Sequence, residues 1–240
     1  MTSDDLVRRR ARQLAAQAAS SGDPVGWFET LYAEASAGRA VVPWDDGQPN
    51  PHLTEWAKTA APRGIIGPGR RALVVGCGVC DDPGFLASLG CQVTAFDVSP
   101  TAVAEARRRF PRSPVDYEVA DLLAPPPGWQ GAFGLVVEIY TVQALYGEAR
   151  AAAIRALPRL VAPGGTLLVI ARATDDQDPV RDAAMMPWPL TRRELEAMAG
   201  NTLLVRSVEK FLDDEDPPKL RWRAEFTRPL RDSSRFTSSR

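Results

Sequence analysis

The fold is decided by residues 72–97, which read ALVVGCGVCDDPGFLASLGCQVTAFD. The run Ala72–Val75 is apolar and rich in branched side chains, a pattern typical of a buried parallel strand. It ends in Gly76-Cys77-Gly78, where glycine permits a tight turn and a close approach of the backbone to a bound molecule. After a short helix, Gln92–Phe96 predicts a second strand with Asp97 at its carboxyl end. A strand–turn–helix–strand unit with an acid about twenty residues past the glycines is the layout of a nucleoside-binding site.

The chain on either side of this unit alternates between strand and helix patterns, which predicts a mostly parallel sheet covered by helices. Seven strands are expected, at residues 72–75, 92–96, 115–119, 133–139, 166–172, 203–211 and 220–228. The last two follow one another without a helix, so we expect an antiparallel hairpin at one edge of the sheet. The sequence therefore predicts an α/β fold with a doubly wound, seven-stranded, mostly parallel sheet.

Three parts are predicted along the chain: an N-terminal helical cap (1–42), a main domain (43–230) and a flexible polar tail (231–240). The cap contains two helix patterns. The main domain begins with a loop that carries Trp44, and the three prolines and one glycine within residues 42–51 prevent regular structure there. This loop is either a lid over the nucleoside-type turn or a linker from the cap.

Composition excludes several classes of protein. The 240 residues carry 29 Lys and Arg against 30 Asp and Glu, a net charge of −1, which argues against nucleic acid as a partner. No apolar run approaches the roughly 18 residues of a membrane span, and no signal peptide precedes the helices. Three cysteines do not indicate a disulfide framework. We expect a cytoplasmic protein with no membrane partner; no feature of the sequence predicts its oligomeric state.

The residues after the glycine turn indicate the charge of the ligand. A dinucleotide site has the pattern G-x-G-x-x-G, but here Asp81 holds the third glycine position and Asp82 follows it. Carboxylates at this turn oppose a pyrophosphate, which binds uncompensated N–H groups. A cationic ligand has the opposite preference. S-adenosylmethionine has a nucleoside, a sulfonium and an ammonium group, and it lacks phosphate.

From Trp44 to Arg228 the chain resembles the class I S-adenosylmethionine-dependent methyltransferases. VVGCGVC resembles their G-x-G-x-G motif, with Cys80 in place of the last glycine, and FGLVVEIYTVQAL and APGGTLLV resemble two later motifs. The resemblance implies a Rossmann-like methyltransferase fold. It also implies that the backbone of Gly76, Cys77 and Gly78 lies against the cofactor, S-adenosylmethionine.

The same resemblance assigns acidic residues to parts of the cofactor. Asp97, with Val98 in TAFDVS, would take the ribose hydroxyls, and Asp121, with Leu122 in VADLL, would accept from the adenine amino group. Simpler roles stay open, because Asp97 is also placed to cap the next helix and Asp121 to form a turn. Glu138 ends a predicted strand, so it is either a contact for the cofactor or substrate or a structural residue.

The loop PWDDGQPNPHLTEW (residues 43–56) resembles the N-terminal loop of the thiopurine and tellurite-resistance methyltransferase group. That resemblance implies a lid over the cofactor, with Trp44 near the sulfonium. The face of an aromatic ring attracts a cation by about 0.5–2 kcal/mol.

The predicted activity is methyl transfer from S-adenosylmethionine to a small, largely apolar acceptor, by in-line displacement at carbon. A thiol acceptor ionises with little help, whereas a hydroxyl or amine more often needs a base. The candidate catalytic residues are His52, Asp46 and Glu138. The expected substrate pocket includes Tyr140, Gln143 and the loop Met185–Trp188, of which Trp188 is a predicted lining residue.

Other interpretations compete with this one. Cys77 and Cys80 form a C-x-x-C at a helix start, which is a redox pattern, although the carboxylates beside it would raise a thiol pKa. A zinc site would need Cys91 and His52 as well, and we expect no metal. An NAD(P)-dependent oxidoreductase would have the missing third glycine. A non-catalytic S-adenosylmethionine-binding protein is the third alternative.

Overall fold

The structure is a computed structural model, and it describes residues 3–79, 81–175, 182 and 186–230. Cys80, Met185 and the predicted tail 231–240 lie outside the described residues.

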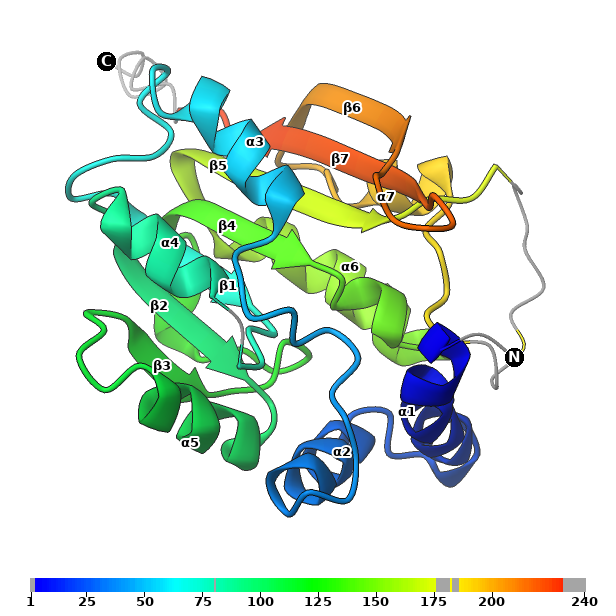
Figure 1. The fold of residues 1–240 in the computed structure, drawn as a ribbon. Helices are drawn as coiled ribbons and strands as arrows, with labels where there is room; N and C mark the ends of the chain where they lie inside the picture. Colours follow the sequence, from blue (N-terminus) through cyan, green and yellow to red (C-terminus); the bar gives the residue numbers. More distant parts are fainter. Residues whose placement is uncertain (1–2, 80, 176–181, 183–185, 231–240) are drawn as a thin grey trace, which may run out of the picture.

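A seven-stranded sheet in the order β3-β2-β1-β4-β5-β7-β6 forms the centre of the molecule (Figure 1). Strands β1 to β5 pair with one another in parallel, and β7 pairs antiparallel with both β5 and β6. This topology confirms the predicted doubly wound sheet with an antiparallel edge hairpin. The strands are β1 (Arg71–Val75), β2 (Gln92–Asp97), β3 (Asp116–Val119), β4 (Phe133–Ile139), β5 (Val161–Arg172), β6 (Leu204–Leu212) and β7 (Leu220–Thr227).

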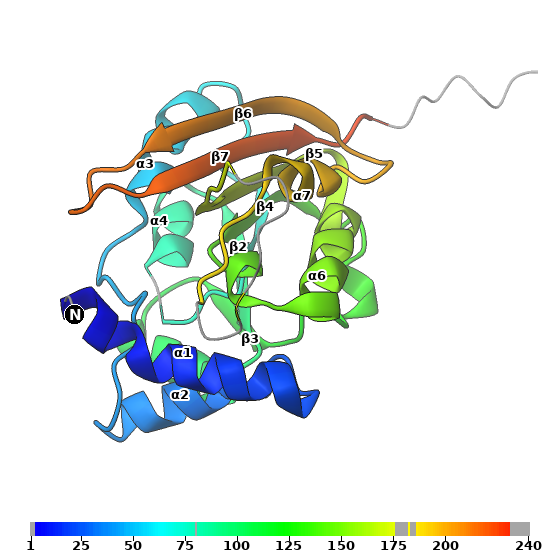
Figure 2. The same ribbon diagram turned by 90° about the vertical axis from the view of Figure 1, so that its right-hand side faces the viewer.

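Helices cover both faces of the sheet (Figures 1 and 2). Alternate side chains of β1 enter different cores: Ala72 and Val74 pack with α3, α4 and α5, whereas Leu73 and Val75 pack with α6 and α7. Burial on both faces explains why this strand reads as a continuous apolar run. The helices are α1 (Ser3–Ser21), α2 (Gly26–Ser36), α3 (Pro51–Ala60), α4 (Asp82–Ser88), α5 (Pro100–Arg109), α6 (Gly147–Leu160) and α7 (Arg192–Ala197), with short 3-10 helices η1 (Pro127–Trp129) and η2 (Val142–Ala144).

Helices α1 and α2 pack side by side and cover one end of the sheet (Figure 2). Trp27 and Leu31 of α2 share a core with Met186. Glu29 of α2 fixes the cap to the main domain by accepting hydrogen bonds from the hydroxyls of Ser99 (2.6 Å) and Thr101 (2.5 Å). The cap is therefore bonded to the loop that follows β2.

Most strand boundaries lie within one residue of the sequence prediction, and the start of β5 differs by five residues. Strand β5 begins at Val161, not at Thr166, because Val161 already pairs with Phe133 of β4; the register then shifts before Thr166 pairs with Leu135, and Gly164, with a φ of +75°, lies in this irregularity. Helix α3 begins at Pro51, where the Asn50 side chain accepts hydrogen bonds from two backbone N–H groups of the first turn. None of the helices in the described ranges is long and apolar enough to cross a membrane.

Helix α3 is anchored to β7 by one buried carboxylate. Glu225 accepts a hydrogen bond from the Trp56 indole (2.9 Å) and two from the Arg63 guanidinium (2.8 and 2.7 Å). Because α3 follows the proline-rich loop directly, this anchor also fixes where that loop ends.

Glu225→Ala should lower the free energy of unfolding by about 2–3 kcal/mol, because the buried Trp56 N–H loses its acceptor. Glu55→Ala is the matched control on the same helix, since Glu55 forms only an exposed pair with Lys58, and it should cost less than about 1 kcal/mol. Urea unfolding of both variants measures the difference. Equal losses would contradict the anchoring role of Glu225.

Candidate functional site

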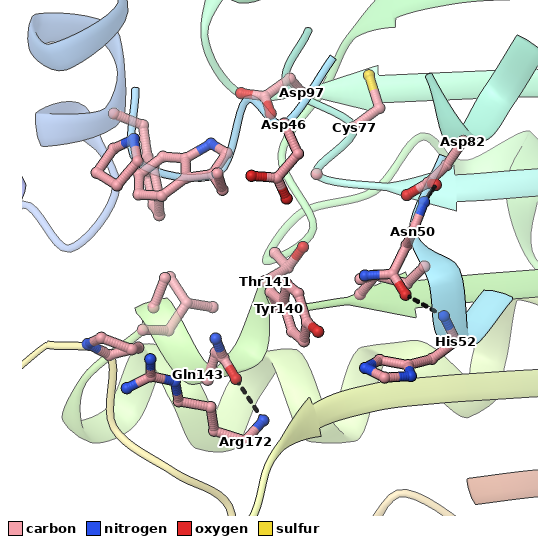
Figure 3. Close-up of a pocket in the computed structure, with 18 of the residues that line it drawn as sticks. Asp46, Asn50, His52, Cys77, Asp82, Asp97, Tyr140, Thr141, Gln143 and Arg172 are labelled. Atoms are coloured by element: carbon pink, nitrogen blue, oxygen red, sulfur yellow. Dashed lines mark hydrogen bonds between the residues drawn. The ribbon is translucent and has the colours of Figure 1, made fainter. Parts of the chain in front are cut away.

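A cleft of about 1030 Å³ opens at the carboxyl ends of the parallel strands (Figure 3). Gly76 follows β1, Asp97 ends β2, Ile139 ends β4 and Arg172 ends β5, and all four line it. Ligands of open α/β sheets bind at this edge. Pockets for single small molecules span about 300–1,000 Å³, so this cleft has room for a nucleoside cofactor and a small second molecule.

The turn after β1 requires glycine at two positions. Gly76 and Gly78 have φ values of +57° and +52°, in the left-handed region that other residues rarely adopt. A Cβ atom at Gly76 would lie 2.5 Å from the Thr141 hydroxyl oxygen, and one at Gly78 would lie 2.4 Å from the Tyr32 hydroxyl oxygen. Only glycine therefore fits at these two positions, because any side chain there would clash with Thr141 or Tyr32.

Asp97 lies buried beside this turn, with 6% of its surface exposed. Its two carboxylate oxygens accept hydrogen bonds from the backbone N–H groups of Gly78 and Ser99, each at 2.9 Å. Burial raises the pKa of Asp97 to about 6, although these N–H groups favour the ionised form. A carboxylate has about four acceptor sites, so two bonds leave capacity for a ligand.

The far end of the cleft, beside β2 and β3, contains Val98, Asp121 and Leu122. One Asp121 carboxylate oxygen accepts a hydrogen bond from the Leu123 N–H at 2.8 Å. Asp121 thus forms the local turn considered from the sequence and lines the cleft as well.

Aromatic side chains of the cap and the proline-rich loop form one wall. The Trp44 indole N–H donates to the Tyr32 hydroxyl at 2.8 Å. The Trp44 ring meets the rings of Trp27, Phe28 and Tyr32 edge-on, at centroid distances of 6.3–6.4 Å. Trp44 is therefore held by the cap, and it lines the cleft as predicted from its position in the loop.

The loop is hydrogen-bonded to the rest of the domain at two points after Trp44, namely Asp45 and Asn50. Asp82, predicted as one of the carboxylates beside the glycine turn, accepts a hydrogen bond from the Asn50 N–H at 2.6 Å. Arg109 donates to Asp45 at 2.7 Å and to the Val79 carbonyl at 3.1 Å. The loop is thus fixed against the glycine turn.

The end of the cleft nearest β5 and β7 contains His52 and Tyr140 (Figure 3). His52 is about half-buried, and burial, together with the charge of Arg221, lowers its pKa below the usual value. Tyr140 has a left-handed φ of +64°, uncommon for an aromatic residue, and the Arg221 guanidinium stacks 4.9 Å from its ring centroid. Burial raises the pKa of the Tyr140 hydroxyl. Because its pKa is lowered, His52 is uncharged at neutral pH and able to accept a proton.

Three predicted site residues, Gly78, Glu138 and Trp188, are not among the residues that line the cleft. Gly78 lies in the turn after β1, where its N–H donates to Asp97. Glu138 is fully buried below the cleft, where one carboxylate oxygen accepts hydrogen bonds from the N–H groups of Thr141 (2.8 Å) and Val142 (2.9 Å) and so caps η2. Trp188 is buried against Tyr146, with ring centroids 5.1 Å apart, while its neighbours Met186 and Pro187 line the cleft instead. The remaining predicted residues in this region, Asp46, His52, Tyr140 and Gln143, do line it.

The cysteine chemistry considered from the sequence finds no support in the environment of Cys77. Its thiol is buried, and burial and the nearby Asp97 raise its pKa well above the usual value, so it is not a ready thiolate. Cys80 lies outside the described residues. Within the described ranges, no three His, Cys, Asp or Glu side chains form a group suited to a metal ion.

Several lining residues were not identified from the sequence. The turn between β6 and β7 was interpreted only as an acidic turn, yet the pairing of β7 with β5 brings it to the cleft. The aromatic face of α2 was the signal for Phe28 and Tyr32. The lining residues that the sequence did not single out include Phe28, Tyr32, Asn50, Thr141, Leu145, Arg172, Asp213, Asp214, Glu215 and Arg221.

The charge of the lining favours a cation. Eight carboxylates and three arginines line the cleft, and one arginine, Arg221, is bonded to Asp213 (2.6 Å) and paired with Glu215. Such a site attracts a sulfonium and an ammonium group and opposes a pyrophosphate. The eight are Asp46, Glu55, Asp82, Asp97, Asp121, Asp213, Asp214 and Glu215, and the three are Arg8, Arg172 and Arg221.

Known proteins match this architecture. The family described as a methyltransferase domain matches residues 72–165. The chain is 28% identical over 159 residues to a probable thiol methyltransferase 2 of Arabidopsis thaliana, covering 62% of this chain and 68% of that protein. It is 25% identical over 198 residues to a 2-heptyl-1-hydroxyquinolin-4(1H)-one methyltransferase of Mycobacteroides abscessus, covering 80% of each. The solved N-methyltransferase NodS of Bradyrhizobium japonicum WM9, in complex with S-adenosyl-L-homocysteine, has a TM-score of 0.61 at 21% identity, covering 84% of this chain and 99% of that one.

Residues 72–165 therefore carry a methyltransferase domain, and the relatives, together with the fold of the solved structure, support a class I S-adenosylmethionine-dependent methyltransferase. S-adenosylmethionine is its cofactor, as the sequence predicted. The similarity of the proline-rich loop to the thiopurine and tellurite-resistance group stays a prediction.

Glu138 predicts a specific pH dependence of stability. Its second carboxylate oxygen has no hydrogen-bond partner among the described residues, and burial raises its pKa from 4.5 to about 7. Between these two pH values the folded protein keeps a proton that the unfolded chain has lost, so the free energy of unfolding falls as pH rises through this window.

Glu138→Gln keeps the oxygen that caps η2 but cannot ionise. Relative to the wild type, this variant should gain up to about 3 kcal/mol of stability between pH 4.5 and 7.5, at about 1.4 kcal/mol per pKa unit. Urea unfolding of both proteins across this range gives the difference in their free energies of unfolding at each pH. The titration of Asp97 contributes equally to both proteins and drops out of this difference. A difference independent of pH would contradict the buried, proton-holding state of Glu138.

Proposed function

We propose that this cleft transfers the methyl group of S-adenosylmethionine to a small, largely apolar acceptor at a thiol, hydroxyl or amine group. The observation that carries the proposal is a carboxylate-lined cleft at the strand ends, closed on one side by aromatic rings and large enough for two small molecules. The two relatives named for a thiol and for a hydroxyquinolinone acceptor support a small acceptor.

In this proposal the cofactor is held by the residues around the glycine turn. Asp97 takes the ribose hydroxyls, Asp121 accepts from the adenine amino group, and the Gly76–Gly78 backbone lies along the amino-acid portion. Trp44 presents its ring to the sulfonium. These residues fit the cofactor, because the side chains nearest the turn are carboxylates. Carboxylates accept hydrogen bonds from hydroxyl groups and attract a cation. When bound, the cofactor supplies a methyl group already activated by the positive charge on sulfur.

The protein's own contribution is alignment, exclusion of water and, for some acceptors, removal of a proton. Phe28, Leu145 and Met186 give the acceptor region an apolar lining. His52 is neutral and lines the same cleft, so we propose it as the base for a hydroxyl acceptor; Asp46 is the second candidate. Glu138 is not placed to act on an acceptor, and we propose that it positions η2.

Incubation with S-adenosylmethionine and a panel of thiophenols, phenols and anilines tests this function, with formation of S-adenosylhomocysteine measured by mass spectrometry. We expect turnover with at least one class. His52→Gln should slow methylation of a phenol by about 100-fold or more, the usual effect of losing a general base, and methylation of a thiophenol by less than about 10-fold. Binding of the cofactor without turnover of any acceptor would favour a non-catalytic role, and equal losses for both acceptors would exclude His52 as the base.

A further inference from the structure

Gln143 presents a fixed hydrogen-bond donor to the cleft. It lies in η2 with only 6% of its surface exposed, and it lines the cleft. Its Oε1 accepts a hydrogen bond from the backbone N–H of Arg172 at 2.6 Å. In Figure 3 its amide nitrogen points away from that bond and into the cavity.

The orientation of this amide is set by its partner. A backbone N–H can only donate, so the atom facing Arg172 must be the oxygen, and the NH₂ group must face the other way. In the part of the chain that the structure describes, no group accepts a hydrogen bond from this Nε2. The cleft therefore contains a nine-tenths buried amide donor with an open position in front of it.

Four contacts hold the segment around Gln143 in place. The Glu138 carboxylate caps η2, and the Thr141 hydroxyl donates to the Val75 carbonyl at 3.1 Å. The Gln143 carbonyl accepts from the Trp188 N–H at 2.8 Å, and Arg150 donates to the Val142 carbonyl at 3.2 Å. A donor on such a rigid segment discriminates between ligands, because a buried N–H without an acceptor is costly and the segment cannot move to avoid it.

The position of the Gln143 amide suits contact with the methyl acceptor and not with the cofactor. Figure 3 shows Asp97 and Cys77 on one side of the cleft and Gln143 with Arg172 on the opposite side, with Tyr140 and Thr141 between them. Met186 and Leu145, which are apolar, line the same cleft. A molecule that fits here offers an apolar body and one oxygen that accepts a hydrogen bond.

We propose that Gln143 is a specificity-determining residue that donates to a carbonyl-type oxygen of the methyl acceptor. The acceptor class is then a small, largely apolar molecule that carries a ketone, amide or ring carbonyl in addition to its nucleophilic group. This inference rests on the proposed function, because it assigns the second molecule in the cleft to the methyl acceptor.

Matched ligand pairs test the inference by binding, so the test does not require turnover. The probes are the three positional isomers of hydroxyacetophenone and the corresponding ethylphenols, in which a CH₂ group replaces the carbonyl. Each is titrated by calorimetry into the protein saturated with S-adenosylhomocysteine. The wild type should bind at least one ketone about 10- to 100-fold more tightly than its ethyl counterpart, the usual effect of satisfying a buried donor.

Gln143→Glu is the decisive variant because it keeps the size of the side chain and the bond from the Arg172 N–H but replaces the donor by a carboxylate oxygen. It should weaken ketone binding at least 10-fold and change ethylphenol binding by less than about 3-fold. Gln143→Leu should bind both members of a pair equally. Melting curves of both variants confirm that they are folded.

Each other outcome overturns the inference in a distinguishable way. A ketone preference retained in Gln143→Glu, or no preference in the wild type, would show that Gln143 does not recognise the oxygen. Weaker binding of S-adenosylhomocysteine to Gln143→Glu would assign the amide to the cofactor instead. Absence of S-adenosylhomocysteine binding to the wild type would contradict the proposed function itself, and it is measured first.

Discussion

The hydrogen bonds from the N–H groups of Gly78 and Ser99 to the buried Asp97 carboxylate are the constraint on which the site depends. They join the turn after β1 to the end of β2, so the two strand ends form one rigid edge. A buried carboxylate is costly without such partners, and even with them burial raises the pKa of Asp97 to about 6. Hydroxyl donors from a ligand would complete its set of hydrogen bonds, which ties the stability of this edge to occupation of the cleft.

The cap and the loop are connected to the same edge. Glu29 of α2 bonds the Ser99 hydroxyl, and the Ser99 N–H bonds Asp97. On the other side of the turn, Asp82 holds the loop at Asn50. The wall that excludes water and the carboxylate at the end of β2 are therefore positioned by hydrogen bonds on both sides of the glycine turn. This arrangement suits a reaction in which the protein mainly aligns two molecules and removes solvent.

Local sequence patterns were sufficient to predict the elements and the edge hairpin, because short apolar strand runs alternate along the chain with helix patterns, except at the last two strands, which no helix separates. They also located the glycine turn and Asp97, since both lie at strand ends. They could not place Glu138, because β4 is apolar on both faces and the pattern does not say toward which face its last residues turn. The side of the cleft formed by Asp213 to Glu215 depends on long-range pairing of β7 with β5, and the direction of the Gln143 amide depends on the Arg172 N–H; neither leaves a local signal.

The most direct measurement is a calorimetric titration of wild type and Asp97→Asn with S-adenosylhomocysteine, with NAD⁺ and NADPH as comparisons. Loss of a hydrogen bond to a charged group costs about 1.5–3 kcal/mol, so the variant should bind S-adenosylhomocysteine about 10- to 100-fold more weakly. Wild-type affinity should also fall as pH drops below 6, because protonation of Asp97 removes the acceptor. Neither dinucleotide should bind measurably. Unchanged affinity in the variant together with no loss at low pH, or tighter binding of a dinucleotide, would contradict the account of this cleft.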